Sequence, residues 1–542
     1  TVGAVLGSYH PHGDASVYLF GKNGEAPNDS ILYKNLNIHY YDKLQVRPNM
    51  LYRWMNYQQF VRSKQMRASN RTRLYSQYRQ EQVQEKLSQL GIFSYMDMQY
   101  APRDTTAACD TLDVTMQATF AKPLDAELEL NVVTKSNDQT GPGASFGVTR
   151  NNVFGGGESW NVKLKGSYEW QTGGGEKSSL MNSWEMGLST SLTFPRVVFP
   201  HLGKREFDFP ATTTFRLYIN QLNRAKYYKL LSFGGNATYD FQPSRTSRHS
   251  ITPFKLTFNV LQHQSEDFKE IAEANPALYV SLRNQFIPAM EYTYTYDNAS
   301  GRRIKNPIWW QSTVTSAGNI TSLIYRAFGK PFNEEDKSLL GAPFAQFVKL
   351  NTELRHLWNI DKNNAIASRM AVGALFTYGN ATIAPYSEQF YVGGANSIRA
   401  FTVRSVGPGG YHPEEGKYSY LDQTGTFRFE ANVEYRFRIF KSFWGATFLD
   451  AGNVWLLRKD RKLLADGKEA RPNSQLRLKT FPKQIALGTG VGIRYDMDIL
   501  VFRLDFGIPL HLPYDTERSG YYNVTGAFFK NLGIHFAIGY PF

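Results

Sequence analysis

One arginine in this sequence lies where a cation needs a partner. Arg399 occurs in YVGGANSIRAFTVRSVGPGG, residues 391–410, a glycine-rich loop between two segments with strand patterns. A guanidinium in a partly dehydrated site is costly unless carboxylate or carbonyl oxygens bind it, and it offers them a planar pair of donors that lysine lacks. Glu434 and Asp450 are the candidate partners. We predict that loop 380–420 folds back onto the neighbouring strands and that Arg399 binds one or both carboxylates.

Other residue patterns point to chemistry less specifically. Gly-Thr-Gly-Val-Gly at 488–492 precedes no helix, so it does not predict a dinucleotide site. Two histidines within residues 10–13 could bind a metal, although chance histidines are the simpler interpretation. Glu127 and Glu129 could serve glycoside chemistry or simply line a lumen or rim. The single cysteine, Cys109, excludes an internal disulfide and a cysteine zinc cluster, and no Ser-His-Asp pattern occurs, so we expect no enzyme, metal or cofactor.

Composition and charge narrow the class of protein. The 542 residues carry a net charge of +14, and 15% of them are aromatic. The charge suits anionic partners such as lipid headgroups or nucleic acid, but no basic recognition helix or aromatic RNA-binding motif is present, so we expect no nucleic acid. The sequence contains no run of 18 apolar residues that would predict a transmembrane helix. A transmembrane barrel is compatible with this, because its strands hide an apolar face in every second residue.

Strict alternation predicts strands in most of the chain. In FRFEANVEYRFRIF, residues 427–440, apolar residues share one face and charged residues, including Glu434, share the other. A later segment places Arg503 and Asp505 on its inward face. Segment 532–542 is expected to form a strand that alternates in the same way, and the residues on one side of it are Leu532, Ile534, Phe536, Ile538, Tyr540 and Phe542.

About 16 such strands are expected. They start near residues 125, 143, 158, 182, 211, 226, 248, 283, 308, 345, 365, 427, 443, 483, 500 and 532. Many reach about ten residues, which with a tilt suits a bilayer, and aromatic residues gather at strand ends as they do in membrane girdles. A soluble sandwich would need an apolar core where these strands carry charges. We therefore predict a mostly β fold, a 16-stranded transmembrane antiparallel β-barrel over residues 122–542.

The first part of the chain has a different pattern. Residues 32–121 predict a small α+β domain in the order strand, helix, helix, strand, strand, and residues 1–31 are assigned to an upstream region. Because the first 30 residues lack a basic start followed by an apolar core, we expect a mature or trimmed form. The expected elements of the small domain are 36–41, 47–61, 79–91, 92–100 and 111–120.

A four-residue motif in the loop resembles a family signature. Ile398-Arg399-Ala400-Phe401 is similar to the Val/Ile-Arg-Gly-Phe/Tyr motif of the bacterial surface antigen family, which includes BamA and TamA, with alanine in place of the usual glycine. In that family the motif lies on a long extracellular loop and its arginine makes the same contact. The resemblance implies that the loop enters the barrel lumen and that Ile398, Arg399 and Phe401 belong to the site.

The segment after the loop carries a second pattern of this family. Phe-x-Asp-x-Gly-x-x-Trp occurs at 448–455, with Asp450 and Gly452 at two of its fixed positions. Alternating glycines in segment 485–494 would permit close approach of the loop backbone. Simple alternation puts Asp450 on the same side as Phe448, so we expect either a β-bulge that shifts the register or a position of Asp450 near the rim.

The resemblance implies a role and a location. The barrel would lie in the bacterial outer membrane, with the small domain as a polypeptide-transport-associated (POTRA) domain in the periplasm, and would assemble, insert or translocate other proteins. The loop is most similar to that of the TamA-like lipoprotein (TamL) branch, in which a lipidated cysteine would precede residue 1. Implied partners are outer-membrane lipids including lipopolysaccharide, client outer-membrane or exported proteins, and a periplasmic or inner-membrane-spanning protein. A passive porin or solute channel is the alternative, and an outer-membrane hydrolase is a third class.

A weak seam between the first and last strands would let such a barrel open sideways. The exposed strand edges could then bind a client strand by β-augmentation. Glycines and a proline near the end of the sequence would weaken the pairing. The residues expected at this seam are Leu128, Leu130, Gly533, Gly539 and Phe542.

Overall fold

The structure is a computed structural model, and its described residues fall into two compact units, one built around the small N-terminal domain and one around most of the large sheet. The histidines of segment 10–13 and Cys109 lie outside the described residues. The described residues are 15–34, 36–57, 77–102, 112–134, 139–171, 183–200, 210–224, 228–266, 269, 284–299, 304–332, 337–339, 342–380, 384–413, 423–459, 469, 471–497 and 500–542.

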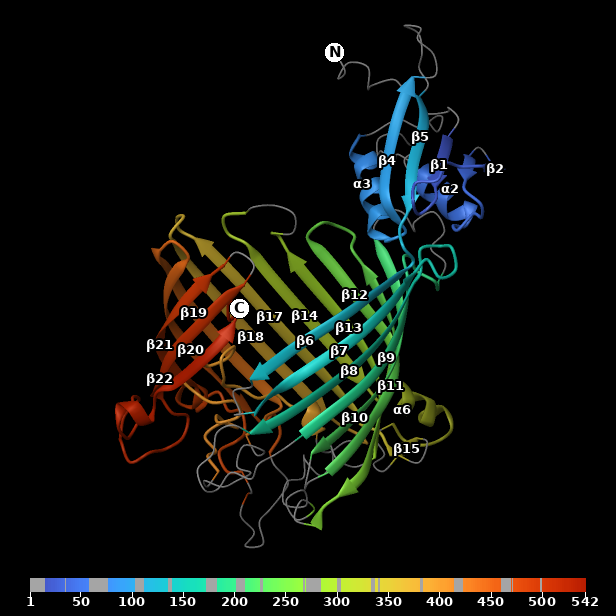
Figure 1. Cartoon of the computed structure of the whole chain (residues 1–542). Helices are drawn as coiled ribbons and strands as arrows, with labels where there is room; N and C mark the ends of the chain where they lie inside the picture. Colours follow the sequence, from blue (N-terminus) through green and yellow to red (C-terminus); the bar gives the residue numbers. More distant parts are fainter. Residues whose placement is uncertain are drawn as a thin grey trace, which may run out of the picture. The chain divides into compact units, whose positions relative to one another are not determined.

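Within the described residues, the small domain comprises a five-stranded sheet and the helices α2 and α3 (Figure 1). The strand order is β2-β3-β1-β5-β4, in which β1 pairs in parallel with β3 and β5, whereas β2–β3 and β4–β5 are antiparallel. The helices α2 and α3 connect β3 to β4. The bounds are β1 Ala15–Phe20, β2 Asp29–Tyr33, β3 Leu36–Tyr40, α2 Pro48–Tyr57, α3 Gln77–Gln89, β4 Phe93–Pro102 and β5 Leu112–Phe120.

Apolar side chains from the sheet and both helices form the core of this domain. Val17, Ile38, Leu51 and Leu87 are all fully buried in it. The predicted start of the domain at residue 32 is too late, because β1 is the central strand of the sheet. A strand of six residues gives too short an alternation to be separated from a loop by pattern alone. The predicted helices and the two strands after them are present.

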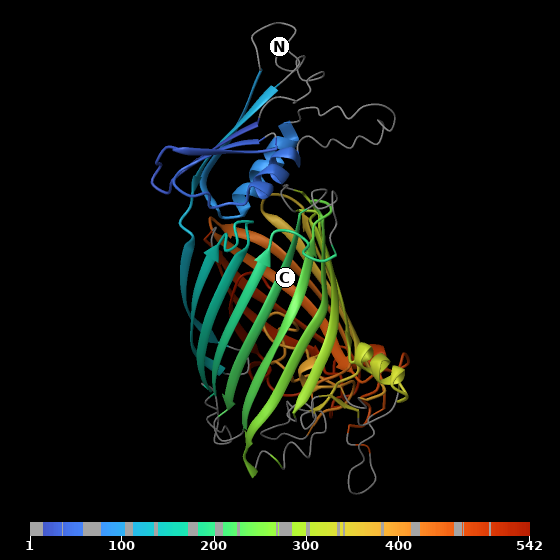
Figure 2. The ribbon, with the colours of Figure 1, turned by 90° about the vertical axis from the view of Figure 1, so that its right-hand side faces the viewer.

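The large sheet has sixteen strands, which confirms the predicted number. Strands adjacent in the sheet are also successive in the chain, and the sheet curves around a lumen as a barrel wall (Figures 1 and 2). Its strands are β6 Leu124–Thr134, β7 Gln139–Asn151, β8 Ser159–Gln171, β9 Ser183–Phe194, β10 Ala211–Arg224, β11 Tyr228–Phe241, β12 Ser247–Gln264, β13 Gln285–Asp297, β14 Ile308–Ala317, β17 Phe347–Asn359, β18 Asn364–Thr377, β19 Phe427–Phe440, β20 Phe443–Trp455, β21 Ala486–Asp496, β22 Val501–His511 and β23 Gly533–Ile538.

The two faces of these strands alternate as the sequence predicts. On β19, Val433 is 48% exposed, whereas the next residue, Glu434, is fully buried. On β22, Arg503 and Asp505 are buried and point inward. Exposed apolar side chains form the lipid-facing surface of such a barrel, and the buried polar side chains line its lumen.

The last strand is shorter than the sequence suggests. β23 ends at Ile538, and Gly539 has a φ of 87°, which turns the chain away from the strand direction. The ring of Tyr540 lies 4.2 Å from the guanidinium carbon of Arg436, a lumen residue, and the ring of Phe542 lies 5.8 Å from it. The predicted strand over 532–542 therefore ends too late, because Tyr540 and Phe542 lie beyond the end of β23.

Short elements lie in the connections between the strands. The connection from β14 to β17 contains helix α6 (Asn319–Ala327) and the strand pair β15 (Ser338–Leu339) and β16 (Ala342–Pro343). No helix in the described part of the chain is long and apolar enough to cross a membrane. Single 3-10 turns occur at η2 (Tyr386–Glu388), η4 (Phe481–Gln484) and η5 (Phe528–Lys530).

Candidate functional site

The loop between β18 and β19 folds back inside the barrel. Residues 384–413 of this loop contribute to an apolar cluster with side chains of the wall, in which Ile398 is fully buried and Phe401 is 8% exposed. The N–H of Gly394 donates to the carbonyl oxygen of Phe401 at 2.7 Å and closes the tip of the loop. This closed tip carries Arg399 toward β19 and β20.

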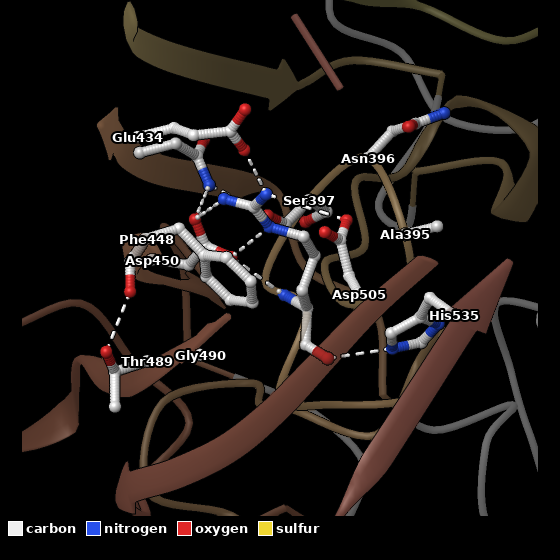
Figure 3. Close-up of polar contacts among 12 residues, drawn as sticks. Ala395, Asn396, Ser397, Glu434, Phe448, Asp450, Thr489, Gly490, Asp505 and His535 are labelled. Atoms are coloured by element: carbon white, nitrogen blue, oxygen red, sulfur yellow. Dashed lines mark hydrogen bonds and ion pairs between the residues drawn. The ribbon is translucent and has the colours of Figure 1, made fainter. Parts of the chain in front are cut away.

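Arg399 forms a buried ion cluster with Asp450 and Glu434, and Asp505 lies 3.7 Å from its Nη1 (Figure 3). Its Nε donates to Asp450 Oδ2 at 2.8 Å and its Nη2 donates to Asp450 Oδ1 at 2.9 Å, a bidentate pair. Its Nη1 donates to Glu434, and its guanidinium carbon lies 3.5 Å from the centre of the Phe448 ring. Burial alone would lower the pKa of this loop arginine, but its bonds to Asp450 and the nearby carboxylates raise that pKa above its usual value. Both contacts that the sequence predicted for Arg399 are present.

Three more arginines surround Glu434 and a third carboxylate, Asp505. Glu434 accepts hydrogen bonds from Arg436 Nε at 2.8 Å and from Arg494 Nη2 at 3.0 Å. Arg494 Nη1 also donates to Asp505 Oδ1 at 2.6 Å, and Arg503 Nη1 lies 3.4 Å from Asp505 Oδ2. Because each carboxylate lies against at least one guanidinium, the cluster suits a structural lock and not proton transfer.

The position of Asp450 shows where the expectation from alternation failed. β20 pairs with β19 and β21 without a register shift near Asp450, and Asp450 is fully buried. Phe448 also faces inward and is 3% exposed, because its ring lies against the guanidinium of Arg399. Both the expected bulge and the expected rim position are wrong. The error was to assume that an aromatic side chain on this strand must face lipid.

Glycines of the facing strands make room for the loop. A Cβ on Gly488 would lie 2.3 Å from the Cβ of Ala400, so this glycine accommodates the alanine found in the loop motif. A Cβ on Gly507 of β22 would lie 2.6 Å from the carbonyl oxygen of Arg399. Gly452 makes room within the sheet and not for the loop, because a Cβ there would lie 2.5 Å from a backbone carbonyl oxygen of β19. The expected landing surface on β21 is present and extends to β22.

Further polar residues, whose link to the loop the sequence did not predict, complete its attachment, and Figure 3 shows one of them, His535. Ser397 Oγ donates to Glu430 Oε2 at 2.6 Å. Arg503 Nη2 donates to a side-chain oxygen of the loop at 2.7 Å, and His535 Nε2 donates to the carbonyl oxygen of Arg399 at 2.7 Å. Alternation had already placed Arg503 inward. Which inward groups reach the loop depends on the path of the loop, which has no periodic pattern to read.

The residues predicted for a seam come from the two ends of the sheet, where β6 and β23 are the edge strands. Leu128 and Leu130 on β6 are 67% and 73% exposed. Gly533 pairs with β22, whereas Gly539 and Phe542 lie beyond the end of β23. Within the described residues no ladder joins β6 to β23, so the structure does not pair these residues with one another.

Two other sequence patterns that could have indicated chemistry lie within the strands of the sheet. Glu129 lies 3.4 Å from Lys163, an ion pair between neighbouring parts of the sheet. Residues 488–492 lie within β21 and open no helix. Among the described residues, no group of three or more histidine, cysteine, aspartate or glutamate side chains is placed to hold a metal ion.

Comparison with known proteins gives the chain a family. Residues 152–542, more than half of the chain, match the Omp85 superfamily domain. In fold, the chain is similar to BamA from Haemophilus ducreyi lacking POTRA domains 1–3, with a TM-score of 0.56, 13% sequence identity, and coverage of 94% of this chain and 88% of that one. A match to CdiB from Acinetobacter baumannii has a TM-score of 0.47 and 11% identity, and covers 93% of this chain and 71% of that one. This chain therefore belongs to the Omp85 superfamily, whose members are non-enzymatic factors that insert proteins into the bacterial outer membrane or translocate them across it.

Proposed function

We propose that this chain assembles or translocates outer-membrane or exported client proteins and works through a lateral seam between β6 and β23. The observation that carries the proposal is the buried attachment of loop 384–413 to the barrel wall through Arg399. A barrel that opens at its side must keep its other strands in register while it does so. An internal lock on β19, β20 and β22 supplies that rigidity next to the C-terminal edge of the sheet.

A passive porin or solute channel fits this site less well. The lumen of a porin is a water-filled channel lined by polar side chains. Here the loop residues Ile398 and Arg399 are fully buried against the wall, one in an apolar cluster and the other in an ion cluster. A wide and steady pore would therefore require the loop to leave both its buried apolar contacts and its buried ion pairs.

The edge strands offer backbone groups that a client strand could bind. β23 has six residues and pairs with β22 over six positions, whereas a membrane strand usually has about 9–11 residues. A short edge strand leaves N–H and C=O groups without ladder partners. A client strand could add to this edge by β-augmentation, which needs backbone complementarity but little sequence specificity.

The small domain and the branch of the family complete the proposal. Its five-stranded sheet with two helices supports a role as a POTRA-like module, which would lie in the periplasm. The loop sequence GGANSIRAF, residues 393–401, supports the TamL branch. The partners we propose are outer-membrane lipids including lipopolysaccharide, client proteins, and a periplasmic or inner-membrane-spanning protein.

Reconstitution of the chain in lipid vesicles tests this function. An unfolded β-barrel client is added, and its folding is followed by its gel mobility before heating. We expect faster client folding with the native chain than with empty vesicles or with Arg399→Ala. The matched control Arg404→Ala changes another arginine of the same loop, one whose guanidinium lies 4.5 Å from the ring of Tyr391, and should stay close to the native chain. A large, steady single-channel conductance without any effect on client folding would support the porin and contradict the proposal.

A further inference from the structure

Helix α6 turns its apolar face outward. Ile320, Leu323 and Ile324 are 45%, 55% and 52% exposed, and Phe328, just beyond the helix, is 84% exposed. Their spacing of three and four residues puts all four side chains on one side of the helix. In an ordinary surface helix the apolar side faces the protein. In α6 the apolar side faces away from the protein, so we ask what covers it.

Buried hydrogen bonds fix α6 in this orientation. Its polar side carries Thr321 and Ser322, which are both buried. Ser322 Oγ donates to Gln346 Oε1 on the barrel side at 3.0 Å. Lys337, which is 1% exposed, donates from Nζ to Ser322 Oγ at 3.2 Å. Rotation of the helix to bury its apolar side would leave these polar groups without partners, which is costly.

A row of aromatic rings joins α6 to the outer surface of the barrel wall. Ring centres lie 5.2 Å apart for Phe233 and Phe258, 6.0 Å for Phe258 and Phe286, and 6.1 Å for Phe344 and Tyr325 of the helix. Phe286 and Phe344 are joined by an isolated β-bridge. Phe233 is 41% exposed on the lipid-facing side of β11. The apolar side of α6 is therefore continuous with the surface that lipid covers.

The position of α6 along the wall matches the edge of a bilayer. Trp310 faces outward near the opposite end of β14, and its ring lies 5.4 Å from that of Tyr294, as in an aromatic girdle. Gly318, which precedes α6, follows Trp310 by eight residues. At about 3.3 Å per residue this is about 26 Å along the strand, or about 20 Å of height after the usual barrel tilt. Because the apolar band of such a barrel is about 25 Å tall, α6 lies at the other edge of the band.

We propose that α6 is an interfacial anchor that buries its four exposed apolar side chains among the acyl chains at the edge of the outer leaflet. Short amphipathic helices bind such an interface by inserting their apolar side just below the headgroups. α6 follows the ninth strand of the sheet counted from β6, so it lies far in strand order from both edge strands. The anchor holds this wall of the barrel at a fixed depth, away from both edges of the sheet.

Site-specific fluorescence in vesicles tests the anchor. The whole chain with Cys109→Ser and Ile324→Cys carries an environment-sensitive label and is reconstituted at low protein density in phosphatidylcholine vesicles. Some of these lipids carry a nitroxide quencher near the headgroup end of an acyl chain. Phe328→Cys is the second test position. The control is Lys479→Cys, an exposed position between β20 and β21, at the same end of the barrel as α6 because β14 and β20 run in the same direction.

The expected result separates lipid from water and from protein. Nitroxide lipid should quench the labels at Ile324→Cys and Phe328→Cys about twofold or more relative to Lys479→Cys, and aqueous iodide should show the opposite preference. Gel migration before and after heating shows that each labelled barrel is folded. Equal quenching at all three positions would overturn the proposal. Protection from iodide that is unaffected by nitroxide lipid and grows with protein density would also overturn it, because a second copy of the chain would then cover α6.

Discussion

Arg399→Ala is the most direct test of the ion cluster in the lumen. The substitution removes a larger share of the charged contacts of Asp450 than of those of Glu434. Glu434 keeps its contacts with Arg436 at 2.8 Å and Arg494 at 3.0 Å. Asp450 is fully buried, and its described ion pair is the one with Arg399. Removal of one partner of a buried charged pair typically costs about 3–5 kcal/mol, and we expect this cost to come mainly from Asp450.

The free energy of unfolding can be measured for the whole barrel by denaturant titration, with the folded fraction read from gel mobility before heating. Arg404→Ala, in the same loop, should cost less than Arg399→Ala, because Arg404 is half-buried, whereas Arg399 is fully buried against two carboxylates. Asp450→Asn added to Arg399→Ala should recover part of the loss, because it removes the unpaired charge. The reasoning is refuted if Arg399→Ala costs no more than Arg404→Ala, or if the double variant is less stable than Arg399→Ala alone.

Three further predictions concern the loop contacts and the barrel. Gly488→Ala should destabilise the loop by about 1–3 kcal/mol through overpacking, and Ala400→Gly in the same chain should restore it, because the two Cβ atoms would otherwise lie 2.3 Å apart; denaturant titration measures both. His535→Leu should remove the hydrogen bond to the carbonyl of Arg399 and cost about 1–3 kcal/mol, whereas His535→Gln, which keeps a donor, should cost less in the same titration. The native chain should migrate differently with and without heating, and identical migration would contradict a closed barrel.

Most of the barrel was predictable because lipid and lumen impose opposite demands on successive residues. Predicted strand starts at 308, 427 and 443 coincide with the first residues of β14, β19 and β20. The small domain was harder, since its central strand, β1, has only six residues and is buried against helices and other strands. Such a short strand does not lie between lipid and a lumen. Its sequence therefore lacks the long alternation of apolar and polar residues that identifies a barrel strand.

Two features of the sequence, the alternation of residues along the strands and the loop motif, predicted part of the site. They placed Glu434 in the lumen and gave Arg399 its two partners. Alternation shows that Phe448 and Asp450 share a face, but it does not say which face when aromatic residues occur on both. The contribution of Asp505 depends on the three-dimensional path of the loop tip, where the guanidinium of Arg399 approaches it to 3.7 Å. No local pattern in the sequence encodes that approach.

The same ion cluster contacts the end of the sheet that carries the short edge strand β23, which pairs with β22 over six positions. His535 donates to the carbonyl of Arg399 at 2.7 Å, and the ring of Tyr540 lies 4.2 Å from Arg436. Arg399 and Arg436 both bind Glu434, so this end of the sheet meets one cluster at two points. Side-chain contacts in the lumen thus supplement a ladder that is too short to hold the strand well. If the proposed seam opens, the edge tied to this cluster is the costlier one to displace, and the movement should begin on the side of β6.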